Sequence, residues 1–173
     1  MNHLTPLLAR SWALLMLAAG LLLSQRAEAQ VLLSSTPLIA GQHYVAGNIL
    51  VYADADNVYI RYILNDGWTL KETHLAVEAD LASIPQTGSG NVKVGRFDYG
   101  ESFSGIAQVA LYSVPRSELG TLNLYIATHA VVEGVGVGRQ TAWSGPYDFA
   151  GKNWATYIYV NGDGDGDGPP PNR

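Results

Sequence analysis

Two histidines and a glutamate are the residues of this sequence whose types and spacing best fit metal chemistry. Glu72 and His74 are two positions apart in a strand-like run, residues 68–77, so their side chains are expected on one face. His129 lies within a second strand-like run. Two imidazoles and a carboxylate are ligands that zinc accepts. The competing interpretation is that each histidine hydrogen-bonds within a sheet, to a backbone carbonyl or to Glu72.

An acidic repeat near the C-terminus offers a weaker candidate for calcium. Asp163, Asp165 and Asp167 alternate with glycine, and alternating carboxylates resemble the first half of a calcium loop. The repeat has no glutamate at the twelfth position and runs into three prolines. A solvated acidic spacer is therefore the competing interpretation.

Aromatic side chains are the candidates for ligand contact. Trp68, Trp143, Tyr147 and Trp154 are a large set for a small domain, and flat rings on a rim can stack on sugar rings. Large aromatic residues also fill the cores of β-sandwiches. Exposure of the rings decides between a glycan-binding role and packing.

Motifs for catalysis are missing from the sequence. It contains no nucleophile elbow, no phosphate loop and no His-Glu-x-x-His pattern, and Gly134, Gly136 and Gly138 read as a hairpin because no helix follows them. The absence of cysteine excludes disulfides, thiolate metal sites and cysteine nucleophiles. These absences favour a binding role over an enzymatic one.

The pattern of hydrophobic residues predicts an all-β fold. Short runs rich in β-branched and aromatic residues are separated by Gly, Asn, Asp and Pro, and no long helical stripe interrupts them. We expect a single antiparallel β-sandwich of about seven strands. Residues 54–57 and 65–67 are expected to form hairpin turns, and residues 79–101 a long surface loop. The strand-like runs are 47–52, 57–64, 68–77, 106–114, 122–132, 140–143 and 154–160.

The ends of the chain predict export and a mobile tail. Residues 1–29 have the charged start, short apolar run and Ala-Glu-Ala site of a cleaved signal peptide. Residues 30–42 are then a lead-in, and residues 43–160 form the sandwich. The Gly/Asp/Pro-rich residues 161–173 are expected to be disordered.

Charge and hydropathy limit the partners. The chain has ten basic and 15 acidic residues; the first 29 residues hold two and one of these, so the mature chain carries a formal charge of −6. This balance argues against nucleic acid as a partner. No segment after the signal peptide is long and apolar enough to span a membrane. The mature product is expected to be periplasmic or extracellular.

Five short blocks in order resemble a recurring all-β module of bacterial secreted and surface proteins. The resemblance implies an extracellular β module and transfers no catalytic residue. The turn after the fourth block, residues 144–148, is less glycine-rich here than in similar sequences. The blocks are residues 67–70 with 72–75, GWTL and ETHL; residues 129–132, HAVV; residues 141–143, TAW; and residues 151–157, GKNWATY.

Three functions follow as hypotheses. The first is a secreted, non-catalytic module that binds a glycan or another extracellular surface component through the 79–101 loop and exposed aromatic residues. The second is a zinc-type metal domain, or a metal-supported enzyme, that uses Glu72, His74 and His129. The third is a structural matrix or adhesion subunit that assembles through its sheet edges.

Overall fold

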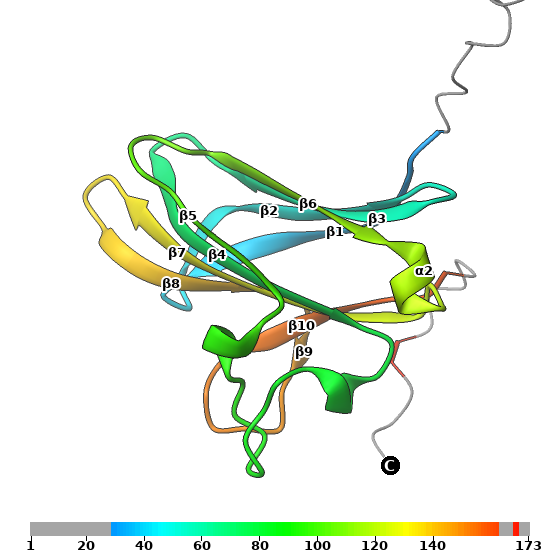
Figure 1. Ribbon diagram of the computed structural model, residues 1–173. Helices are drawn as coiled ribbons and strands as arrows, with labels where there is room; N and C mark the ends of the chain where they lie inside the picture. The colour runs from blue at the N-terminus through cyan, green and yellow to red at the C-terminus, as the bar shows by residue number, and fades with distance from the viewer. Residues whose placement is uncertain (1–28, 163–167, 170–173) are drawn as a thin grey trace, which may run out of the picture.

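The computed structural model describes residues 29–162 together with 168 and 169, and these are folded almost entirely into antiparallel strands (Figure 1). The predicted all-β fold is confirmed, with more strands than the seven expected. No helix in the described ranges is long and apolar enough to cross a membrane. The elements are β1 (Val31–Ala40), β2 (Tyr44–Ala53), β3 (Asn57–Leu64), β4 (Trp68–Glu78), η1 (Leu81–Ser83), η2 (Val94–Arg96), β5 (Tyr99–Ser102), β6 (Val109–Pro115), α2 (Arg116–Leu119), β7 (Leu124–Gly134), β8 (Gly138–Ser144), β9 (Tyr147–Asp148) and β10 (Thr156–Val160).

Several predictions about the chain ends fall outside these residues. The signal peptide, apart from Ala29, and the acidic repeat Asp163, Asp165 and Asp167 are not among the described residues. The expected lead-in, residues 30–42, is different: most of it is strand β1, which pairs with both β2 and β8. Its alternation is irregular because the register with β2 shifts between Leu32 and Ser34, which hid the strand pattern.

One sheet folds over itself to make two layers. Its strand order is β5-β4-β7-β8-β1-β2-β3-β6, with β10 paired to β7 and β9 to β10. Figure 1 shows β1, β2, β3 and β6 in one layer, and β4, β5, β7, β8 and β10 in the other. The link is β1, whose residues Leu38–Ala40 pair with β8. We call these the β2 layer and the β7 layer.

The main core lies between the two layers. In β3, Val58, Ile60, Tyr62 and Leu64 alternate inward, as the two-residue period requires. The hydroxyl of Tyr62 donates a hydrogen bond of 3.0 Å to the carbonyl oxygen of His74 in the opposite layer. This bond satisfies the one polar atom of a fully buried ring and connects the layers.

A second, smaller core covers the outer face of the β7 layer. Strand β7 is buried on both sides: Leu124 and Ile126 enter the main core, whereas Tyr125 and Ala127 face outward into the second one. Ile84, from the 79–98 excursion, is fully buried there. The second core also contains Ala76, Trp143, Phe149, Ala155 and Tyr157.

Hydrogen bonds between the Asn91 side chain and backbone N–H groups attach the excursion to the C-terminal part of the chain. The side-chain oxygen of Asn91 accepts hydrogen bonds from the backbone N–H groups of Lys152 and Asn153 at 2.8 and 3.2 Å. A Cβ on Gly151 would lie 2.6 Å from the carbonyl oxygen of Gly90, so the two loops touch at their tips. The expected surface loop is therefore a cover that is part of the folded domain.

One of the two predicted hairpins is confirmed and the other is wrong. The 54–57 turn joins the paired strands β2 and β3, and Asp54 Oδ1 accepts hydrogen bonds from the N–H groups of Asp56 and Asn57. The 65–67 turn instead carries the chain from β3 in one layer to β4 in the other, and these strands do not pair. Asn65 Nδ2 donates to the carbonyl oxygen of Val45, which holds this corner against β2.

We predict that Ile84→Ala destabilises the domain by about 2–4 kcal/mol, because it leaves a cavity under the excursion. Urea unfolding followed by circular dichroism measures the change. Ser83→Ala, at an exposed neighbouring position, is the control and should change stability by less than about 0.5 kcal/mol. Equal stability of the Ile84 variant and the wild type would mean that the excursion is not part of the cooperative unit.

Candidate functional site: a pocket at one end of the sandwich

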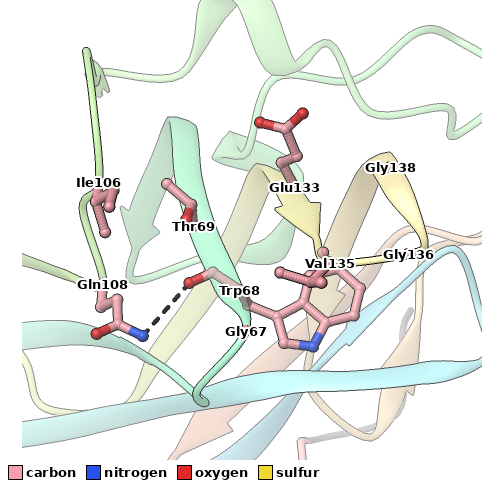
Figure 2. Close-up of a pocket in the computed structure, with 10 residues that line it drawn as sticks. Gly67, Trp68, Thr69, Ile106, Gln108, Glu133, Val135, Gly136 and Gly138 are labelled. Atoms are coloured by element: carbon pink, nitrogen blue, oxygen red, sulfur yellow. Dashed lines mark hydrogen bonds between the residues drawn. The ribbon is translucent and has the colours of Figure 1, made fainter.

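An open pocket of about 610 Å³ lies at one end of the two layers. Three connections form it: the 65–67 corner, the segment between β5 and β6, and the turn of the β7–β8 hairpin (Figures 1 and 2). They lie far apart in the sequence and meet because the layers end together. The lining residues are Gly67, Trp68, Thr69, Ile106, Gln108, Glu133, Gly134, Val135, Gly136 and Gly138.

The indole of Trp68 is the large aromatic surface of this pocket. Trp68 begins β4 and packs partly against the main core. Its cross-strand partner is Gly134, and a Cβ there would lie 2.8–3.0 Å from atoms of the six-membered ring. The glycine therefore lets the indole lie flat over the neighbouring strand. The ring of Tyr44, 6.1 Å away between centroids, supports Trp68.

Two exposed aliphatic side chains line the pocket together with the indole. Figure 2 shows Ile106 on one side of β4 and Val135 on the other. Their exposed fractions are 89% and 87%, the highest among the exposed large hydrophobic residues of the described chain. Val135 is held out because Gly136 and Gly138 take positive φ in the hairpin turn, which agrees with the hairpin predicted at 134–138.

Polar groups complete the lining. Gln108 Nε2 donates to the carbonyl oxygen of Trp68 at 3.5 Å, which orients the amide at the pocket wall (Figure 2). Glu133 pairs with Lys71 at 2.8 Å, and this hydrogen bond, with the lysine charge, lowers the pKa of the Glu133 carboxyl. The pocket thus offers one ionised carboxylate, an amide and the hydroxyl of Thr69 beside apolar surface.

The other three aromatic candidates do not line this pocket. Trp143 is only 5% exposed and packs in the second core against Phe97, so the packing interpretation describes it. Tyr147 is half-buried and stacks on Tyr157 with 5.5 Å between ring centroids. Trp154 is half-buried against the same core. The four rings therefore do not form one binding surface.

The structure does bring Glu72, His74 and His129 together, on the outer face of the β7 layer. Glu72 Oε2 lies 3.7 Å from His74 Nε2, and the imidazole of His74 lies 5.5 Å from that of His129. Glu72 Oε1 accepts a hydrogen bond from Arg139 at 2.5 Å. A bulge between Leu70 and Glu72 shifts the alternation of β4, so Glu72 and His74 point outward although Leu70 points inward.

This histidine cluster does not have the geometry of a metal centre. Among residues 29–162, 168 and 169, no three His, Asp or Glu side chains are placed to hold a metal ion. Glu72 is already engaged by a guanidinium, which competes with a cation. His129 packs against Trp143 with 4.9 Å between ring centroids. The geometry is that of side chains packed within a sheet.

His129 is nevertheless an unusual core residue. Its Nδ1 is buried and has no hydrogen-bond partner in the described part of the chain. Burial, with a smaller repulsion from His74, lowers the pKa of His129 to about 4. The sheet therefore holds this imidazole neutral, and the expected hydrogen bond from the histidine to a sheet partner is missing at Nδ1.

Comparison of the chain with protein-family models, with curated proteins and with solved structures found no match.

Sequence reasoning found Trp68 but missed the residues around it. Val135 is a single aliphatic residue between glycines, outside the predicted strands, whereas Ile106 was expected to begin the 106–114 strand, which in the structure starts only at Val109. An isolated aliphatic residue in a glycine-rich turn is a usable signal, because such a turn cannot bury it. Nothing in the sequence indicated that the segment around Gln108 and the hairpin beside Glu133 face each other.

We predict that acid weakens the fold through His129. Its folded pKa of about 4 lies below the unfolded value of 6.5. Neutral His129 therefore contributes its full share to the free energy of unfolding above pH 6.5. As the pH falls towards 4, the free energy of unfolding decreases by up to about 3 kcal/mol. Urea unfolding between about pH 7 and pH 4.5 measures this loss, above the range where carboxylates dominate. His129→Phe should flatten the profile, and His43→Gln, at an exposed position, should leave it unchanged.

We also predict that Gly134→Ala displaces the Trp68 indole, because the new Cβ would overlap its ring. The expected cost is about 1–3 kcal/mol of stability, with a change in tryptophan fluorescence. Gly88→Ala is the matched control, since a Cβ there meets nothing within 4 Å. Unchanged fluorescence in the Gly134 variant would contradict the placement of the indole.

Proposed function

We propose that this protein is a secreted, non-catalytic module that binds a saccharide in the end pocket around Trp68. The observation that carries the proposal is the combination of a half-buried indole, two exposed aliphatic side chains and convergent polar groups in one open pocket of about 610 Å³. Most ligand sites combine apolar surface with a few oriented polar groups in this way.

The chemistry of the lining suits a sugar ring. A pyranose presents C–H groups on its faces and hydroxyls around its edge. Trp68, Ile106 and Val135 supply apolar contact for the faces. The carboxylate of Glu133 can accept hydrogen bonds from hydroxyls, and the amide oxygen of Gln108 can do the same. A site of this type binds without needing a nucleophile or a general base.

The proposed site differs from the location expected first, the 79–101 loop. Apolar side chains of that loop are used to build the second core. The predicted signal peptide and the resemblance to secreted bacterial modules support an extracellular setting, where polysaccharides are available ligands. The metal hypothesis has weaker support, because the Glu72, His74 and His129 cluster lacks metal geometry among the described residues.

We predict that the mature chain, residues 30–173, binds oligosaccharides on a glycan array and that the affinity depends on the pocket. Trp68→Ala should weaken binding by about 30-fold, corresponding to about 2 kcal/mol, because the stacking surface is lost. Isothermal titration calorimetry with the best glycan from the array gives the affinities.

Two further variants protect this test from a folding defect at Trp68. Ile106→Ser alters an exposed pocket residue and should also weaken binding, whereas Val31→Ser, at an exposed position outside the pocket, should not. Circular dichroism confirms that each variant is folded. No retention of any glycan, or equal affinity of the wild type and Ile106→Ser, would reject the proposal.

A further inference from the structure

The two outer faces of the sandwich are treated differently. The 79–98 excursion and residues 149–157 cover the face of the β7 layer, as the second core shows. The face of the β2 layer has no such cover among the described residues, and Figure 1 shows its strands as the outermost elements on that side. An uncovered antiparallel sheet usually alternates apolar residues inward with polar residues outward.

The outward residues of the β2 layer break that rule. In β3, Tyr59 and Ile63 point outward, opposite the inward Val58, Ile60 and Tyr62. Each of these outward residues is directly opposite one residue of β2 and one of β6, and the three together form a row across the sheet. Val109 and Leu111 are 54% and 51% exposed. The apolar outer face consists of Leu50, Tyr52, Tyr59, Ile63, Val109 and Leu111, with Arg61 at its centre. The polar residues Asn48 and Ser113 lie in the same rows, opposite Ile63 and Tyr59.

Charge is distributed unusually on this surface. The chain has five more acidic than basic residues. The outward positions of β3 at residues 59, 61 and 63, and their partners on β2 and β6, nevertheless include no Asp, Glu or Lys. The guanidinium of Arg61 has neither an ion pair nor a hydrogen bond with any described residue. Two copies of an acidic protein repel over most of their surfaces, so an acid-free face is where they can approach.

The face can also complement itself. The register places Tyr59 and Tyr52 one row from Arg61, which pairs with Leu50 and Leu111. A two-fold arrangement of two faces, offset by one row, sets each guanidinium over a tyrosine ring of the other copy. Tyrosine and arginine among aliphatic residues, without lysine or carboxylates, is the composition of an interface core.

We propose that the apolar outer face of the β2 layer is a homodimer interface. Three strands about 4.8 Å apart, over seven paired residues of about 3.4 Å, give a flat footprint of about 340 Å² per copy. This is below the roughly 800 Å² per partner of a standard stable interface, so the dimer is weak and reversible, in the micromolar range. The proposal is independent of saccharide binding.

Sedimentation equilibrium of the mature chain, from about 1 to 500 µM, tests the proposal across the affinity range expected for a small interface. The mass should rise from monomer to dimer. Leu111→Glu and Arg61→Glu should each weaken association by at least about 10-fold, because they bury an unpaired carboxylate or create repulsion. Lys152→Glu makes the same charge change as Arg61→Glu at an exposed loop position and should have no effect.

Three outcomes would overturn the interface. One is a monomer at every concentration, which would leave the face to another partner. Another is a dimer that persists in Leu111→Glu. The third is a dimer lost in Val135→Glu, at the end pocket, but kept in Leu111→Glu, which would place self-association at the pocket rim. Leu111 and Val135 are both exposed, so these variants are expected to fold, and circular dichroism verifies this.

Discussion

Burial of both faces of strand β7 is the constraint on which the rest of the structure depends. The strand pairs with β4 along one edge and with β8 and β10 along the other. Its side chains are buried in alternation on the two sides. The inward side chains pack against the opposite layer, and the outward side chains need a separate covering segment. Exposing either apolar face to water would cost free energy. The 79–98 excursion, which the sequence makes look like a surface loop, provides that cover together with residues 149–157.

This arrangement leaves two exposed features that the core does not use. The end pocket forms where a corner, a crossing segment and a hairpin reach the same end of the layers. The apolar face of the β2 layer remains exposed because both covering segments of the described chain, the 79–98 excursion and residues 149–157, pack on the β7 layer. The two features lie on different elements, so the proposed ligand binding and the proposed pairing of copies are compatible. A dimer would then present two pockets, and two linked pockets gain avidity for a polymeric ligand.

The candidate residues show where sequence reasoning succeeds. The two-residue period correctly placed Glu72 and His74 on one face, and the pairing of β4 with β7 brought His129 beside them. Whether three neighbouring groups bind a metal depends on distances and competitors, and Arg139 was invisible as a competitor because it lies on β8. Similarly, aromatic content indicated Trp68 and Trp143 equally, but only the first lines a pocket.

The sequence by itself determined the all-β class, the positions of most strands and the 54–57 hairpin, since these depend on side-chain period and on turn residues that act locally. It also determined that no disulfide or thiolate chemistry operates. Only the tertiary structure decided that residues 65–67 cross between layers, that residues 30–42 contain a strand, and which aromatic ring meets solvent. The physical reason is that strand pairing and burial are contacts between residues distant in the chain, and local patterns allow several such pairings.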